Sequence, residues 1–119
     1  MTSLAAFDAF CQGLPGANFI VQWGESHVHK VGPKLFAIGN LTDDGFVFKA
    51  TPLGFEMLLE QGQASRAPYL RRGHWVHVAP SALKRAELFE YLAESHRLAV
   101  AALTRAARRA AGAGACAWD

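Results

Sequence analysis

Short turns between strand-like segments constrain the fold of this chain more than any other feature. A Gly-Pro turn joins the segment 27–31 to the segment 34–41, and an Asp-Asp-Gly turn leads from there into 46–50. Parallel strands need a long crossover, so strands joined by such short turns must be antiparallel. With Phe19–Trp23 as an entry strand, this part of the chain predicts an antiparallel meander of three or four strands.

Two short helices are predicted on either side of the meander. Ser3 is a candidate N-cap for a first helix, which ends at Gly13. Thr51, followed by a proline, is a candidate N-cap for a second helix, which ends at Gly62.

One or two further strands and a long helix complete the pattern. After an irregular stretch over 63–73, the segment His74–Val78 is typical of a strand, and Ser81 begins the last and longest helix. The apolar stripe of this helix, which we expect to pack on the sheet, consists of Phe89, Leu92, His96, Val100 and Leu103.

This order of elements predicts a two-layer α+β sandwich, in which a mostly antiparallel sheet carries the helices on one face. The 119 residues suit one domain, and an apolar fraction of 51% is enough for a core. We place the domain over residues 1–111 and expect the Ala/Gly-rich residues 112–119 to form a flexible tail.

The sequence gives no sign of export or of membrane insertion. The N-terminal residues do not resemble a signal peptide, and no apolar run approaches the roughly 20 residues that a membrane span needs. The two cysteines, Cys11 and Cys116, lie near opposite ends of the chain and are best interpreted as reduced thiols. We therefore predict a cytoplasmic protein without a membrane partner.

The charges are distributed unevenly along the chain. Residues 1–65 contain three lysines and six acidic residues, whereas residues 66–119 contain nine Lys or Arg and four acidic residues. A basic half is typical of a protein that binds nucleic acid or an acidic partner. The alternative is that these arginines solubilise the last helix and complement its dipole.

Four of the five histidines form two closely spaced pairs, which are candidate metal ligands. His27 and His29 are two residues apart on a strand and share a face, whereas His74 and His77 are three apart and point to opposite faces. A zinc site usually needs three or four ligands, so surface or half-buried histidines are the better interpretation. His96 falls in the apolar stripe, where we expect a buried histidine with a hydrogen-bond partner. We predict no metal and no cofactor.

No catalytic constellation stands out either. Cys11 lies on the apolar face of the first helix, where a thiol is usually inert, and Ser26 is only a sequence neighbour of His27. The motifs of nucleophile elbows, phosphate loops and zinc proteases do not occur. We predict that the protein is not an enzyme.

The residues best suited to bind phosphates and bases lie mostly in the irregular region and in the strand after it. Arginine side chains hold phosphates, and exposed aromatic rings stack on bases. Lysines from the meander would add phosphate contacts if they face the same way. The candidate nucleic-acid-binding residues are Lys34, Lys49, Arg66, Tyr69, Arg71, Arg72, His74 and Trp75. The alternative is that the two aromatic rings belong to the core and the arginines extend to solvent.

Several short motifs, taken in order, resemble the MmcQ/YjbR family of small bacterial proteins over about residues 7–104. They are Phe10-Cys11, Leu14-Pro15-Gly16, Trp23-Gly24, His29-Lys30-Val31-Gly32, Lys34, Phe36-Ala37, Phe48-Lys49, Thr51-Pro52, Pro68-Tyr69-Leu70, His74-Trp75-Val76 and Ser95-His96. The resemblance implies an α+β fold of the secretion-chaperone-like type, and the family is commonly labelled DNA-binding by analogy of fold.

The sequence departs from the family pattern at two places. Many members have Lys-Cys-Asp-Pro where this chain has Lys49-Ala50-Thr51-Pro52, and many have Tyr-His-x-Asn-Lys where it has the run 69–73. The second change keeps positive charge but replaces Asn and Lys by Arg and Gly.

Three functions follow as hypotheses. The first is a DNA-binding protein that makes mainly non-specific, salt-sensitive phosphate contacts through the basic loop. The second is a protein-interaction or chaperone-like module that receives a partner on the sheet or on an edge strand, which an exposed apolar patch would favour. The third is a small-ligand pocket between sheet and helices, lined by Trp23, His29 and Trp75.

Overall fold

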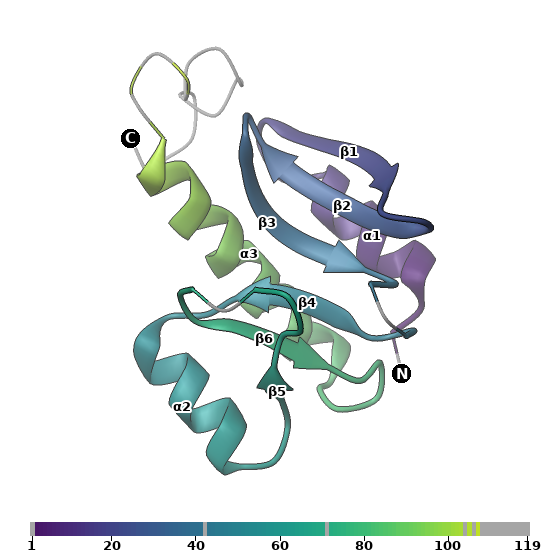
Figure 1. Ribbon diagram of the computed structural model, residues 1–119, viewed down its shortest axis with the longest axis vertical. Helices are drawn as coiled ribbons and strands as arrows, with labels where there is room; N and C mark the ends of the chain where they lie inside the picture. The colour runs from purple at the N-terminus through teal and green to yellow at the C-terminus, as the bar shows by residue number, and fades with distance from the viewer. Residues whose placement is uncertain (1, 42, 71, 104, 106, 108–119) are drawn as a thin grey trace.

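The computed structural model describes residues 2–41, 43–70, 72–103, 105 and 107 of the chain (Figure 1). The elements follow one another as α1 (Leu4–Gln12), β1 (Ala17–Gln22), β2 (Ser26–Val31), β3 (Lys34–Gly39), β4 (Phe46–Lys49), α2 (Pro52–Glu60), β5 (Ser65–Arg66), β6 (Trp75–Val78) and α3 (Arg85–Ala102). The predicted α+β architecture is confirmed.

The strands form one sheet in the order β1-β2-β3-β4-β6-β5, and every neighbouring pair is antiparallel. The predicted meander corresponds to β1–β4, and the predicted later strand corresponds to β6. The prediction allowed one or two strands after the second helix, and the additional strand is β5; its position was not predicted, because two residues within an irregular stretch carry no detectable alternation. The longer strand β1 and the very short β5 are therefore the two edges of the sheet.

The first two helices begin where their caps predicted. The Ser3 hydroxyl accepts a hydrogen bond from the Ala6 N–H, and the Thr51 hydroxyl accepts one from the Gly54 N–H. Each bond satisfies a backbone donor that has no partner within its helix.

The third helix begins later than predicted, at Arg85 rather than near Ser81. The residues before it form a turn in which the Ala82 N–H donates to the Ala79 carbonyl, and Leu83 is buried in the core. The Glu87 carboxylate then accepts a hydrogen bond from the Lys84 N–H, which closes the N-terminus of α3. The turn at Ser81 and the burial of Leu83 after it thus shift the helix start from the serine to Arg85.

Helices α1 and α3 cover one side of the sheet, and α2 lies at the β5 end of the molecule (Figure 1). We call the covered side the helix face and the opposite side the open face. The main core lies between the helix face and the helices, with Phe7, Phe36, Phe48 and Leu92 fully buried in it. The helices therefore lie on one face of the sheet, as predicted.

The buried stripe of α3 differs in one position from the predicted one. Leu92, His96, Val100 and Leu103 are buried as expected, but Leu88 takes the place of Phe89. Phe89 is half-buried and stacks on Phe10 of α1 at 4.2 Å between ring centroids. The boundary predicted at 111 and the tail predicted over 112–119 lie outside the described residues.

Candidate functional site

The histidine pair of β2 binds a carboxylate on the helix face. His27 and His29 share that face, as predicted, and both rings reach Asp8 of α1. The Nδ1–H of His27 donates to Asp8 Oδ2 at 2.6 Å, and the Nε2–H of His29 donates to Asp8 Oδ1 at 2.7 Å. Within the described part of the chain, no three His, Cys, Asp or Glu side chains are arranged to hold a metal ion.

Burial keeps His29 neutral. Desolvation lowers the pKa of His29 from its ordinary 6.5, and it outweighs the hydrogen bond and the charge of Asp8, which act in the opposite direction. The second ring nitrogen, Nδ1, is buried without a hydrogen-bond partner among the described residues. A proton on that nitrogen would be a buried donor with no acceptor, which is a geometric reason for the same conclusion.

Ser95 and His96, on α3, connect the helix to distant backbone. The Ser95 hydroxyl donates to the Phe36 carbonyl at 2.6 Å and accepts from the Lys49 N–H at 2.9 Å. It therefore bridges β3 and β4 just beyond their last backbone pair. The Nε2–H of His96 donates to the Pro15 carbonyl at 2.7 Å, so the predicted role of a buried, hydrogen-bonded histidine is confirmed.

Cys11 packs in the same core. Its side chain is fully buried, and burial raises the pKa of its thiol, with a smaller contribution from the charge of Asp8. The thiol is therefore protonated and matches the interpretation of inert packing.

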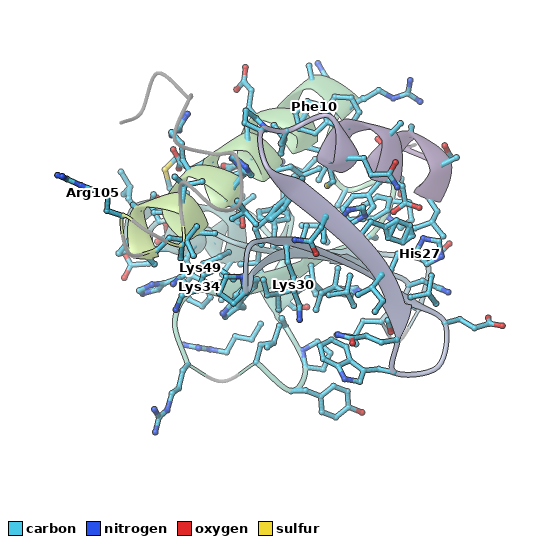
Figure 2. The ribbon with its side chains drawn as sticks, turned by 90° about the horizontal axis from the view of Figure 1, so that it is seen from above. Phe10, His27, Lys30, Lys34, Lys49 and Arg105 are labelled. Atoms are coloured by element: carbon cyan, nitrogen blue, oxygen red, sulfur yellow. The ribbon has the colours of Figure 1, made fainter. Side chains whose placement is uncertain are left out.

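The open face carries basic and apolar side chains that none of the helices within the described residues covers. Lys49 of β4 is directly opposite Trp75 of β6, and Lys30 of β2 is opposite Leu35 of β3. Figure 2 shows Lys30 and Lys49 on one side of the sheet and Phe10 of α1 on the other. The same face carries a smaller buried cluster, which consists of Val28, Ile38, Val47 and Ala67.

The loop between β5 and β6 folds onto this open face. Leu70 packs against the smaller cluster together with Trp75. Gly73 has a φ of +83°, and a Cβ built there would lie 3.5 Å from Lys49 Cε and 3.7 Å from Trp75 Nε1. The absence of a side chain at Gly73 thus lets the loop pass close to the lysine and the indole.

Next to the loop, the open face holds a groove of about 540 Å³. It is lined by the apolar residues Ile38, Leu41 and Leu70 and by the aromatic residues Trp23 and Tyr69. Trp23 is 60% exposed and Tyr69 is 82% exposed. We call this site the aromatic groove.

The eight residues that the sequence proposed as one binding site fall into separate places. Lys49 and Trp75 are paired on the open face, Tyr69 lines the aromatic groove, and Arg72 is exposed on the same loop. Lys34 is exposed at the turn between β2 and β3, and Arg71 lies outside the described residues.

Arg66 and His74 belong to the other side of the sheet. The Arg66 guanidinium lies over the Phe55 ring at 4.8 Å, and the His74 ring meets the same ring edge-on at 5.2 Å. Phe55 is part of the main core, so both residues lie on the side of the helix face. His77, three residues after His74, lies opposite Val47 of the open-face cluster and bonds Asp43 at 2.8 Å, so the two histidines point to opposite faces, as predicted.

Trp75 is neither fully buried nor a free stacking platform. Its ring is half-buried and packs beside Leu70 at the smaller cluster. The predicted ligand pocket between sheet and helices is corrected as well. The groove lies on the opposite face, where Trp23 lines it, while His29 is fully buried beneath α1.

Comparison with known proteins supports both the family resemblance and the predicted fold. The sequence profile of the YjbR family matches residues 12–98. The chain belongs to the YjbR family. No curated protein matches it. The crystal structure of Deinococcus radiodurans protein DR2400, a DUF419 domain, is similar with a TM-score of 0.80 and 24% sequence identity, over 94% of this chain and 89% of that one.

Two residues of the open face were missed as parts of a nucleic-acid site. Lys30 shares its face with Lys49, and Trp23 lines the groove together with Tyr69. Strand alternation gave a usable signal for Lys30, because it is next to His29 and must face away from it. For Trp23, only the Gly24 that follows it, a turn signal, pointed to an exposed position.

Proposed function

We propose that this YjbR-family protein binds nucleic acid on its open face through weak, mainly sequence-independent phosphate contacts. The observation that carries the proposal is the pairing of cations and exposed rings there: Lys30 and Lys49 lie on the same face as Trp23 and Tyr69. The loop cation Arg72 is next to this surface, and we include Arg71 by its place in the sequence. The proposal contains no catalytic step, and a cytoplasmic location stays a prediction.

The surface of α3 is a poor alternative for a polyanion. A second groove there is lined by Glu87, Glu90 and Glu94, and the guanidinium of Arg97 is bonded to Glu94 at 2.7 Å. Three carboxylates would repel phosphates, whereas the open face offers lysines. The charge distribution therefore favours the open face.

The number of phosphates contacted determines how steeply the affinity falls as the salt concentration rises. With about three phosphates contacted on a single strand, the logarithm of the binding constant should fall with a slope of roughly −2 against the logarithm of salt concentration. Between 50 and 200 mM salt this corresponds to a loss of roughly 15- to 20-fold in affinity. Binding should thus be measurable only at low or moderate salt.

A titration of labelled oligonucleotides by fluorescence anisotropy tests the proposal. We expect saturable binding at low salt that weakens as salt rises and that weakens at least fivefold in a Lys30→Ala/Lys49→Ala variant. The matched control is Lys84→Ala/Arg85→Ala, which removes two exposed cations at the start of α3 and should change affinity less than twofold. Absence of binding at low salt, or an equal loss in both variants, would overturn the proposal.

A protein-interaction role is the second candidate, and the edge strand β1 is the observation that favours it. Its sequence, ANFIVQ, contains no charge and no proline, and Ile20 and Val21 are about half exposed. Natural sheets usually protect a long edge by lysines, proline or a bulge, so an unprotected edge suits pairing with a partner strand. Among the described residues, no helix is long and apolar enough to span a membrane.

A further inference from the structure

We infer that the aromatic groove takes one unstacked nucleobase, so that the open face prefers single-stranded over duplex nucleic acid. This inference rests on the proposed function and assigns the ligand chemistry of the same surface. The shared chemistry is a flat aromatic base with an attached phosphate, which a single strand or a free nucleotide would supply.

The size and lining of the groove fit a base. A volume of about 540 Å³ lies within the range of small-ligand sites, and Ile38 provides an apolar floor that is 1% exposed. Trp23 and Tyr69 line the groove and are largely exposed, and every base has a face that can stack on an aromatic ring. In a duplex the faces of the bases are already stacked on each other, so only an unstacked base can enter.

The backbone holds both aromatic residues in a costly conformation. Trp23 has a φ of +53° and Tyr69 a φ of +68°, in the left-handed region that bulky residues rarely adopt. Among the described residues, only one other non-glycine residue has a positive φ, and it is Asn40, next to Leu41 in the groove lining. Two of the three outliers therefore line the groove, and the third precedes a lining residue in the sequence. Strain of this kind persists where the surrounding structure imposes it, commonly at ligand sites.

Hydrogen bonds fix the turn that carries Trp23. The Ser26 hydroxyl lies 3.4 Å from the Trp23 carbonyl and 3.3 Å from the Asn40 carbonyl, and Ser26 is fully buried. The Asn40 side chain donates to the Glu25 carbonyl at 3.1 Å. These contacts tie the β1–β2 turn to the end of β3, so the backbone that carries Trp23 is held in place before any ligand arrives.

Charge next to the groove suits the phosphate of the same nucleotide. Leu70, which lines the groove, and Arg72 belong to one loop, and Gly73 of that loop lies against the Lys49 stem. A base in the groove therefore has cations on the loop side for its phosphate. An apolar peptide side chain would fill the groove but would make no use of these cations, which is why we assign a nucleotide.

The test compares two glycine variants, Trp23→Gly and Tyr69→Gly, with the unchanged protein. Glycine adopts a positive φ without strain, so neither variant should lower the thermal unfolding temperature. The matched control is Leu53→Ala/Met57→Ala, which removes exposed apolar side chains of α2 outside the groove. The probes are a labelled deoxythymidine oligonucleotide, a labelled duplex of equal length, and thymidine monophosphate as a competitor.

We expect the single strand to bind at least tenfold more tightly than the duplex at the same salt. Each glycine variant should lose most of this preference while duplex affinity changes less than twofold, and the control should keep it. Displacement by the monophosphate at concentrations close to those of the oligonucleotide would assign the groove to free nucleotides, with the base chemistry upheld. Equal binding of single strand and duplex, unaffected by either glycine variant, would overturn the inference while leaving salt-sensitive binding in place. Absence of binding to every probe at low salt would instead remove the proposed function itself.

Discussion

The two faces of the sheet differ in the burial and hydrogen bonding of their polar and aromatic side chains. On the helix face, polar groups are buried and bonded: Asp8 accepts from two histidines, Ser95 bridges two strands, and His96 reaches the Pro15 carbonyl. On the open face, Trp23 and Tyr69 are exposed and have strained backbones. A polar group that is buried and bonded stabilises one structure, whereas an exposed ring in a costly conformation contributes nothing to stability that a smaller residue would not.

The motifs that carry the family resemblance can be assigned to the two faces. Leu14-Pro15-Gly16 and Ser95-His96, which carry much of the resemblance, meet on the helix face through the His96–Pro15 bond. They describe how α3 is attached to the sheet and to the turn after α1. Other motifs of the set, such as Trp23-Gly24, Phe48-Lys49 and Pro68-Tyr69-Leu70, contribute residues to the open face, so the family motifs involve both faces of the sheet.

The largest effect is expected from Ser95→Ala on the helix face. The change leaves the Phe36 carbonyl and the Lys49 N–H without their bridging hydroxyl, and Ser95 is 1% exposed, so water cannot easily replace it. We expect the free energy of unfolding to fall by about 2–4 kcal/mol, measured by urea denaturation. The exposed Ser81→Ala serves as control, with a change within about 0.5 kcal/mol.

A measurement of oligonucleotide affinity on the same variant distinguishes the roles of the two faces. At a temperature where Ser95→Ala is still folded, its affinity for an oligonucleotide should equal that of the unchanged protein. A loss of stability below 1 kcal/mol, or a specific loss of binding without unfolding, would contradict the division of roles between the faces.

The second prediction concerns the loss of stability at acidic pH, and it depends on two buried histidines of the helix face. The pKa of His29 is lowered by burial below its ordinary 6.5, and that of His96 is lowered by burial as well. The folded state therefore binds these protons less readily than the unfolded chain does, so their stabilising contribution is present above pH 6.5 and is lost as the pH falls below it. The groups that face His29 are Asp8 of α1 and His27 of β2.

Urea denaturation between pH 7.5 and 5 measures this dependence. The free energy of unfolding should be nearly constant above pH 7 and should decline below 6.5. A His29→Gln variant keeps an N–H donor for Asp8 but does not titrate, so its decline should be shallower. A variant that declines as steeply as the unchanged protein would show that His29 is not the responsible group.

Most of the fold was predictable from local sequence, because caps and turns act within a few residues. Ser3, Thr51 and the Gly-Pro turn each fixed an element boundary to within a residue or two. The start of α3 was not, since it depends on Leu83, whose burial is a tertiary event. Strand β5 consists of two residues and exists only because β6 is next to it.

The candidate site was predictable only in part, for a geometric reason. A register shift between His29 and Lys30 places Phe36 and Ala37 together on the side of the main core, so strict alternation fails along β3. The basic cluster also looked continuous in the sequence, but β5 places Arg66 opposite Val76, in a row that faces the main core. Neighbours in sequence were thus divided between the two faces.

The smallest effect is expected from Arg66→Ala, which tests that division directly. Its guanidinium lies over the Phe55 ring on the side of the helix face, and the side chain is exposed. A cation–π contact at an exposed position contributes roughly 0.5–1 kcal/mol, so the free energy of unfolding should fall by no more than that. Affinity for a single strand should change less than twofold, whereas Lys49→Ala, which removes the same charge from the open face, should weaken it several-fold. If Arg66→Ala weakens binding as much as Lys49→Ala does, the nucleic acid wraps around the β5 edge and contacts both faces, and the open face is then only part of the binding surface.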